Sequence, residues 1–183
     1  MTILQGRLEE VINSSIENNE NPAVVLIDMQ EGVYRFMKDT IHFQDSQQLL
    51  RRQQELLSYA RQEEMPIFVF ELGPYANSTL HKLSSIIWDY TKAFFLTKHF
   101  TSAFKKTDFE DRLRKKHIST LLLMGQRTDV CVLGTAQDAH ALGFQVITAP
   151  TVMDPLILDK YGKLNLPSFY VEYCRTYDDI TSI

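Results

Sequence analysis

Five apolar runs, separated by segments with helical periodicity, restrict the folds open to this chain. They span residues 23–27, 67–70, 93–96, 118–124 and 144–149. Their apolar character is continuous rather than alternating, and such strands are typical of a parallel sheet that is covered by helices on both faces. The pattern therefore predicts a doubly wound α/β fold, with a mostly parallel sheet of five to six strands.

The segments between the runs carry the expected helices. Residues 46–64 place leucines at helical spacing and end before Pro66. Residues 108–117 have acidic residues first and basic residues last, as the helix dipole favours. Residues 128–142 are rich in alanine and stop at Gly143, a residue that often follows a helix C-terminus.

Two segments fit this alternation less well. Residues 72–90 are too long for a simple connection, so we expect them to contain a short helix around 79–88 and to contribute to a substrate pocket. The tail, residues 150–183, is irregular, but it has an alternating stretch that predicts a final edge strand. That stretch consists of Phe169, Val171 and Tyr173.

Length and composition limit the class of protein. A chain of 183 residues that is 44% hydrophobic is long enough for one substantial core, which predicts a single domain over residues 1–183. A net charge of −4 predicts no nucleic-acid partner, and no apolar stretch is long enough to predict a membrane partner. Two cysteines are too few for a disulfide framework, and residues 1–20 do not resemble a secretory signal. We therefore expect a cytoplasmic protein.

Three chemically reactive residues follow the predicted strands. Asp28 follows the first strand, Lys98 the third and Cys131 the fourth. Since ligands of doubly wound proteins bind at the carboxyl ends of the strands, these side chains are expected to meet in one crevice if the strands are neighbours. Taken singly, each has an ordinary interpretation: a turn residue, a solvated lysine and a buried thiol.

The position of Cys131 favours a reactive thiol. If Thr128 caps the following helix, Cys131 lies in the first turn, where free N–H groups and the helix dipole stabilise an anion. A neighbouring ammonium group adds to this effect. We therefore expect a lowered pKa for Cys131 and a thiolate near neutral pH.

Three ordered blocks of the chain form a recognisable pattern. They are Ile27-Asp28-Met29-Gln30, Lys98 with Ser102-Ala103-Phe104, and Thr128-Asp129-Val130-Cys131-Val132 with Thr135 and Ala139. These blocks resemble the isochorismatase-like cysteine hydrolases, a family that includes nicotinamidases and N-carbamoylsarcosine amidohydrolases. The resemblance covers roughly residues 22–149, and the cysteine block is its most specific part.

The resemblance implies a hydrolase that acts on a small amide, carbamoyl or related C–N bond. Cys131 is then the nucleophile, Asp28 transfers its proton, and Lys98 holds both groups in place while a thioester forms and hydrolyses. The family also implies an oxyanion hole made of the backbone N–H groups of Arg127 and Cys131. It further implies a cis peptide between Gln126 and Arg127.

Departures from the family pattern shape the remaining expectations. Nicotinamidases carry a metal-binding Asp-x-His motif after the second strand, where this chain reads Glu71-Leu72-Gly73-Pro74-Tyr75, so we expect neither a metal nor another cofactor. His81 lies nearby without a partner histidine at ligand spacing. Substrate contacts are expected from Gln30, Phe100 and Arg127, with Gln30 orienting Asp28 and Arg127 either pairing with a substrate carboxylate or remaining solvated.

Two alternatives remain open at this stage. One is vinyl-ether hydrolysis of the isochorismatase type, with Asp28 as the acid and Cys131 uninvolved. The other is a non-catalytic family member that acts as an assembly scaffold. Since relatives of this kind commonly associate, we expect a homo-oligomer, a dimer or larger, in either case.

Overall fold

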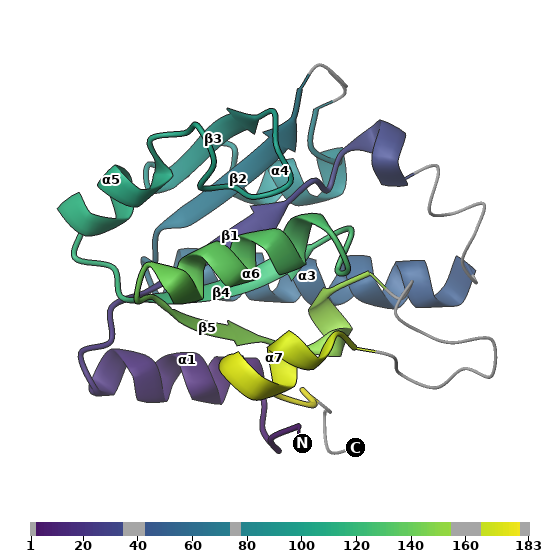
Figure 1. Ribbon diagram of the computed structural model, residues 1–183. Coiled ribbons are helices and arrows are strands. Elements are labelled where there is room, and N and C mark those ends of the chain that lie inside the picture. The colour runs from purple at the N-terminus through teal and green to yellow at the C-terminus, as the bar shows by residue number, and fades with distance from the viewer. Residues whose placement is uncertain (1–2, 35–42, 74–77, 155–165, 180–183) are drawn as a thin grey trace.

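A six-stranded parallel sheet forms the centre of the computed structural model, which describes residues 3–34, 43–73, 78–154 and 166–179 (Figure 1). All five pairs of neighbouring strands are parallel, as predicted. The strands, in chain order, are β1 (Pro22–Ile27), β2 (Ile67–Leu72), β3 (Ala93–Lys98), β4 (Thr120–Gly125), β5 (Gln145–Thr148) and β6 (Arg175–Thr176).

The strand order is β3-β2-β1-β4-β5-β6, so the chain winds outward from β1 in one direction and from β4 in the other. The carboxyl ends of β1 and β4 lie side by side, with Ile27 paired to Gly125. This is the switch point of a doubly wound sheet, where ligands of such folds bind. Both strands are buried at every position, because helices cover both of their faces.

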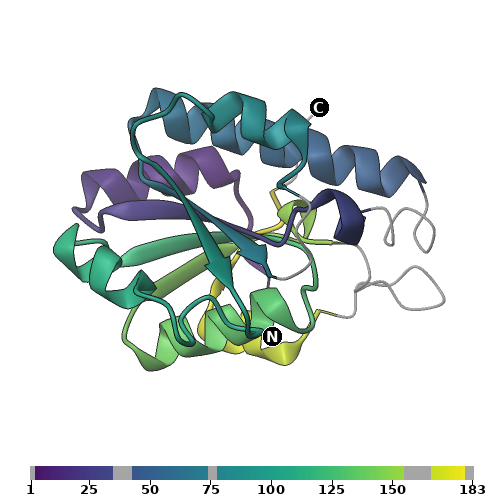
Figure 2. The ribbon, with the colours of Figure 1, turned by 90° about the horizontal axis from the view of Figure 1, so that it is seen from above.

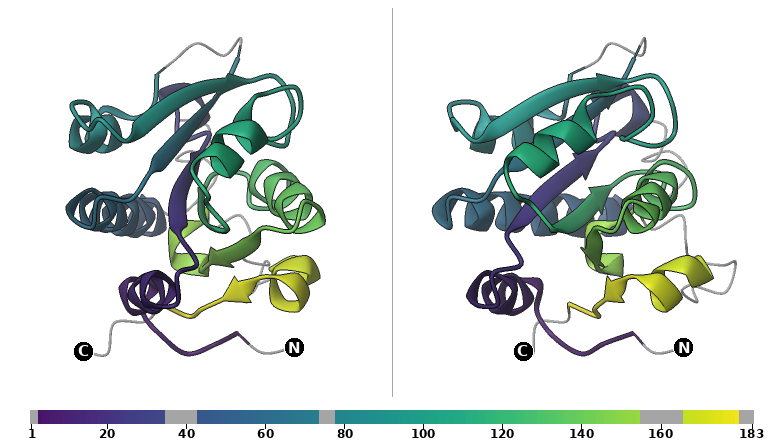
Figure 3. Two further views of the ribbon diagram at one scale, coloured as in Figure 1. Left: turned by 90° about the vertical axis from the view of Figure 1, so that its left-hand side faces the viewer. Right: turned by 60° about the vertical axis from the view of Figure 1, so that its left-hand side comes forward.

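Helices pack on both faces of the sheet (Figures 2 and 3). One face carries α1 (Leu8–Glu17), α3 (Phe43–Gln62) and α4 (His81–Ile87), and the other carries α5 (Phe109–Lys115), α6 (Cys131–Ala141) and α7 (Ser168–Tyr173). The short helix α4 lies within the long segment 72–90, where a helix was expected. None of the helices among the described residues has the length and apolar character needed to cross a membrane.

The predicted edge strand around Phe169 to Tyr173 is wrong, because these residues form helix α7. Phe169 and Tyr173 are four residues apart, so a helix places both rings on one side. Their ring centroids lie 5.0 Å apart, and those of Tyr173 and His140 of α6 also lie 5.0 Å apart. This packing against α6 outweighs the short alternation, and the edge strand β6 begins two residues later.

An ion-pair network fixes the end of the described chain against the α1/α3 face. The Arg52 guanidinium, on α3, donates to Asp179 Oδ1 at 2.6 Å and to Glu9 Oε1 at 2.6 Å. Asp179 also accepts the Leu8 N–H at the start of α1, at 3.0 Å. The Asp179 carboxylate therefore joins two helices that lie far apart in sequence.

Candidate active site

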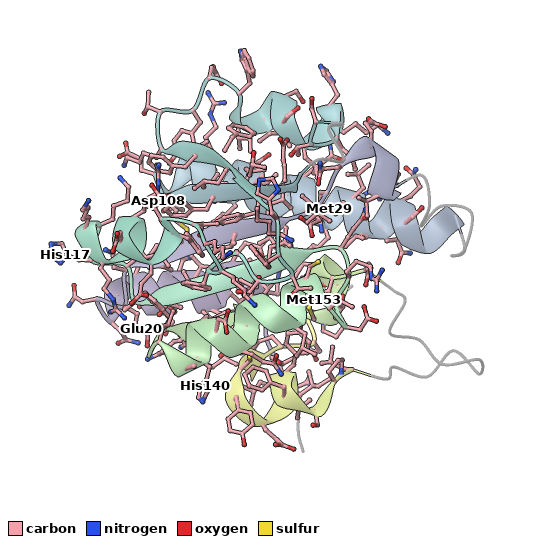
Figure 4. The ribbon with its side chains drawn as sticks, turned by 45° about the horizontal axis from the view of Figure 1, so that its top comes forward. Glu20, Met29, Asp108, His117, His140 and Met153 are labelled. Carbon is pink, nitrogen blue, oxygen red and sulfur yellow. The ribbon has the colours of Figure 1, made fainter. Side chains whose placement is uncertain are left out.

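The predicted catalytic residues lie at the carboxyl edge of the sheet. Met29 and Met153, which are sequence neighbours of Asp28 and Asp154, lie at that edge in Figure 4, and Glu20 and His117 lie at the opposite one. Asp28 follows β1, and Cys131 follows its neighbour β4 after a short turn. Lys98 ends β3, which is not a neighbour of β1, because β2 lies between them.

Lys98 nevertheless reaches Asp28, because its long side chain spans the width of β2. Its ammonium nitrogen Nζ lies 2.8 Å from Asp28 Oδ2 and also donates to the carbonyl oxygens of Phe100, at 3.2 Å, and Thr101, at 3.3 Å. An ammonium group has three N–H donors, and here each has an acceptor. The fully buried charge of Lys98 is thus paired and hydrogen-bonded.

Asp28 keeps one carboxylate oxygen unpaired. Its side chain is almost fully buried, and Oδ1 has no hydrogen-bond partner. Burial raises the pKa of Asp28 above its usual value, and the positive charge of Lys98 opposes this rise. Because Lys98 binds only Oδ2, the second oxygen remains open as a proton acceptor.

Cys131 is the first residue of α6 and is 6% exposed. Asp28 and Lys98 both lie close enough to influence its pKa, which burial and the Asp28 charge raise to about 11 while Lys98 opposes the rise. The expectation of a thiolate near neutral pH is therefore wrong. In the free protein, desolvation and the adjacent carboxylate outweigh the helix terminus, and the sulfur carries its proton.

A glycine makes the turn before Cys131 possible. Gly125 has a φ of +147°, and a Cβ atom at this position would lie 2.2 Å from the carbonyl oxygen of Ile27. That same oxygen accepts the Gln126 N–H at 3.0 Å. Only glycine allows β4 to approach β1 this closely at the end of the sheet.

Asp154 organises the next part of the turn and was not identified from the sequence. Its buried carboxylate accepts the N–H groups of Arg127 at 2.7 Å and Thr128 at 3.2 Å. The 3₁₀ turn Pro150–Val152 lies between β5 and Asp154 and carries the chain back to this edge of the sheet. An isolated parallel β-bridge between Gly125 and Met153 brings Asp154 to this turn. Because that contact forms only in the folded chain, the sequence does not indicate the role of Asp154.

These contacts change two expectations about the turn. The Arg127 N–H does not point to a free oxyanion site in the structure, since it donates to Asp154. Thr128 does not cap α6: its hydroxyl donates to the Asp154 carbonyl oxygen at 3.4 Å, and the N-cap residue is Val130, which provides no side-chain cap. The Cys131 N–H has no backbone acceptor among the described residues. The proposed cis peptide before Arg127 stays a prediction.

Thr135 connects Cys131 to the loop that holds Lys98. Its hydroxyl donates to the Cys131 carbonyl oxygen at 2.8 Å, one turn earlier in α6, and accepts the Ala103 N–H at 3.0 Å. The same loop supplies the Phe100 and Thr101 carbonyl oxygens that bind Lys98. Thr135 therefore links the first turn of α6 to the loop that binds Lys98.

The three residues expected to contact substrate have different surroundings. Gln30 is buried, and its Oε1 accepts the Leu72 N–H at 2.7 Å, while its own backbone N–H donates to the Asp28 carbonyl oxygen. The centroid of the Phe100 ring lies 5.0 Å from Lys105 Nζ and 5.1 Å from Lys106 Nζ. The Arg127 side chain is 45% exposed and lies 3.4 Å from Asp129. Their roles toward a substrate stay predictions.

Metal-ligating side chains do not gather within the described ranges: no group of three His, Cys, Asp or Glu residues there lies close enough to hold an ion. His81 is an exposed residue in the first turn of α4. What the edge of the sheet does provide is a thiol, an open carboxylate oxygen and a buried ammonium group. This set can accept a proton from sulfur and return it to a leaving group.

The doubly wound α/β fold places these groups at its switch point, and the comparisons with known proteins agree on one family of hydrolases. The isochorismatase domain model matches residues 22–150. An uncharacterized isochorismatase family protein, YecD of Escherichia coli O157:H7, is 30% identical over 151 residues, which cover 72% of this chain and 79% of that protein. The chain therefore belongs to the isochorismatase family of hydrolases.

Solved structures show the same fold at low sequence identity. N-carbamoylsarcosine amidase from Thermoplasma acidophilum superposes with a TM-score of 0.68 at 19% identity, covering 88% of this chain and 99% of that one. Nicotinamidase PncA from Bacillus subtilis superposes with a TM-score of 0.69 at 20% identity, covering 86% and 99%. These similarities extend over nearly the whole length of both neighbours.

Proposed function

We propose that this protein hydrolyses a C–N bond of a small amide or carbamoyl compound, with Cys131 as the nucleophile. The observation that carries the proposal is the open Oδ1 atom of Asp28, a buried base beside a buried thiol. Lys98 supports it, because its bond to Oδ2 fixes the carboxylate. The neighbouring folds of an amidase and a nicotinamidase favour the same reaction class.

Proton transfer accompanies attack in this mechanism, because the resting thiol is protonated. The Cys131 sulfur bonds to the substrate carbonyl carbon as its proton moves to Asp28. Asp28 then gives the proton to the leaving nitrogen, the C–N bond breaks, and a thioester remains on Cys131. Water attacks the thioester with Asp28 again as the base, which releases the acid and restores the thiol.

The test is ammonia release from a panel that includes nicotinamide and N-carbamoylsarcosine. Wild-type protein should hydrolyse at least one primary amide or carbamoyl compound, and Cys131→Ala should reduce that rate at least about 10³-fold. Cys174→Ala is the matched control, since Cys174 is also a free, partly buried thiol but no acid or lysine contributes to its pKa, and it should keep the activity. Amide hydrolysis that survives Cys131→Ala would exclude the proposal.

A second candidate, vinyl-ether hydrolysis, is favoured by one observation. Burial raises the pKa of Asp28, and a raised pKa suits a residue that acts as a general acid. Hydrolysis of a vinyl ether such as isochorismate by both wild-type and Cys131→Ala protein would support this reaction. Loss of that hydrolysis in Asp28→Asn would identify the acid.

A further inference from the structure

Buried polar atoms without partners concentrate at the candidate site. Six such side-chain atoms occur among the described residues, and three of them lie just beyond the carboxyl ends of β1 and β4. One is the Asp28 Oδ1 atom, and the others are Oε1 and Nε2 of Gln126. An unpaired buried amide destabilises a fold, so its presence in the candidate site calls for a partner that the free protein does not supply.

Gln126 lies beside Asp28 at the switch point of the sheet. Its backbone N–H donates to the carbonyl oxygen of Ile27, the residue before Asp28, at 3.0 Å. Gln126 and Lys98 are fully buried, and Asp28 is 1% exposed. Gln126 thus shares the buried edge of the sheet with the reactive groups and precedes Cys131 by five residues.

The site needs a further oxyanion donor. Attack by Cys131 on a carbonyl group creates a negatively charged oxygen, which hydrolases of this kind stabilise with preorganised N–H donors. The Cys131 N–H has no backbone acceptor among the described residues, but the Arg127 N–H already donates to Asp154 at 2.7 Å. The Gln126 Nε2 group is a second N–H donor at this edge that has no acceptor.

We propose that the Gln126 side-chain amide binds the reacting O–C–N unit of the substrate. Its Nε2–H donates to the carbonyl oxygen, and its Oε1 accepts an N–H from the leaving nitrogen. When the sulfur–carbon bond forms, the electron pair of the C=O bond moves onto the oxygen that Nε2–H and the Cys131 N–H hold. When the oxygen re-forms its double bond, the C–N bond breaks and the nitrogen leaves with the proton from Asp28.

This inference rests on the proposed function and narrows it. Both contacts require a leaving nitrogen that carries an N–H on the same side as the carbonyl oxygen. Primary amides and terminal carbamoyl groups satisfy this requirement, whereas esters and tertiary amides have no N–H to donate to Oε1. The side chain of Gln126 therefore contributes to specificity as well as to the reaction.

The test uses two small probes, so that it does not depend on knowing the substrate. Iodomethane alkylates Cys131 without forming an oxyanion, and it carries no amide that Gln126 could bind. Acetaldehyde adds to the thiol to give a tetrahedral adduct with an oxygen at the oxyanion position. The alkylation rate is measured by mass spectrometry on the peptide that contains Cys131, with and without acetaldehyde. The alkylation rate without acetaldehyde measures the reactivity of the thiol alone. Protection is expressed relative to that rate in the wild type and in Gln126→Met, which has a side chain of similar length and no amide.

Protection by acetaldehyde should be at least about tenfold weaker in Gln126→Met than in the wild type, because the adduct loses a donor. Thr120→Val is the matched control: Thr120 is also buried, its hydroxyl is also unpaired, and it lies at the other end of β4. It should leave the protection unchanged. Gln126→Leu, which also lacks the amide and adds no charge, should behave like Gln126→Met and serves as the second variant if the first does not fold.

The possible outcomes separate the two proposals. Equal alkylation with equal protection in wild type and both Gln126 variants would overturn the role of Gln126 and leave Cys131 as the nucleophile. Wild-type protein whose Cys131 reacts with neither probe and that hydrolyses none of the amides would overturn the proposed function, and the inference with it. Thermal unfolding gives an independent check, since removing an unpaired buried amide should leave the melting temperature of Gln126→Met unchanged or higher.

Discussion

Lys98 Nζ lies 2.8 Å from Asp28 Oδ2 although an entire strand, β2, separates the strands that carry them. The lysine ends β3, at the edge of the sheet, and its side chain crosses the end of β2 to reach the switch point. A shorter basic side chain on β3 could not make this contact. The lysine binds Oδ2 and leaves Asp28 Oδ1 available to accept the Cys131 proton, and the mechanism proposed above depends on that oxygen.

Replacing Lys98 by methionine should shift the pH dependence of hydrolysis. Burial raises the pKa of Asp28 and Lys98 opposes the rise, so removing the ammonium group raises this pKa further. Asp28 must be ionised to act as a base, and the acid limb of kcat/KM should therefore move to higher pH. At neutral pH the rate should fall by about 100-fold.

The pH profile of ammonia release measures this shift. Lys105→Met is the matched control, because Lys105 lies near Phe100 in the same loop but is not a partner of Asp28. An acid limb that stays in place in Lys98→Met would show that the lysine does not control the ionisation of Asp28.

Ionisation of Cys131 should destabilise the folded protein at alkaline pH. The fold raises the pKa of Cys131 from 9.0 to about 11, so the unfolded chain loses this proton first as the pH rises. The contribution of the protonated Cys131 thiol to the free energy of unfolding is therefore fully present below pH 9, and it decreases between pH 9 and about 11. The contribution of this group to that decrease is about 2–3 kcal/mol.

Urea unfolding of wild type and Cys131→Ala at several pH values isolates this contribution. The difference in free energy of unfolding between the two proteins should shrink across that interval, because the alanine variant lacks the titrating group. Parallel stability curves for the two proteins would indicate that the folded thiol has an ordinary pKa.

Thr135 should matter for both stability and turnover. In Thr135→Val the Ala103 N–H and the Cys131 carbonyl oxygen lose a partner, which should cost about 1–3 kcal/mol of stability. The loop that binds Lys98 then loses its link to α6, so kcat should fall more than KM changes. Thr135→Ser keeps the hydroxyl and should restore both properties, and a valine variant with wild-type kcat would contradict this positioning role.

Arg52 should be much more costly to replace than an exposed ion-pairing residue. Its side chain is 10% exposed and pairs with Asp179 and Glu9, so Arg52→Met leaves two carboxylates without their partner. Breaking a buried pair in this way costs about 3–5 kcal/mol. Arg112→Met, which removes an exposed pair with Asp108, should leave the unfolding midpoint almost unchanged, and a similar loss in both variants would argue against the network.

The positions of Asp28 and Cys131 were predictable because each follows a strand whose apolar run is evident in the sequence. The parallel sheet was predictable for the same reason. The contact between Lys98 and Asp28 was not fully predictable, since strand order decides which strand ends are neighbours. Helix α7 was predicted as a strand because its aromatic residues also fit a short alternating pattern. The packing of Tyr173 against His140, which favours the helix over the strand, is visible only in the structure.

Asp154 and Gln126 required the structure. Asp154 acts on Arg127 and Thr128 from 26 or 27 residues away, through a bridge that brings Met153 beside Gly125. Gln126 is conspicuous only because its buried amide has no partner, a property that a sequence does not record. The raised pKa of Cys131 likewise follows from burial and from the adjacent carboxylate, which together outweigh its place at the start of a helix.

The most direct test of the central claim is mass spectrometry of the protein quenched with acid during turnover of an amide that it hydrolyses. We predict a mass increase equal to the acyl group on the peptide that contains Cys131, with Cys174 unmodified in the same sample. Asp28→Asn should show no such adduct. Steady turnover with an unmodified Cys131, or an acyl group on Cys174 instead, would contradict the proposed mechanism.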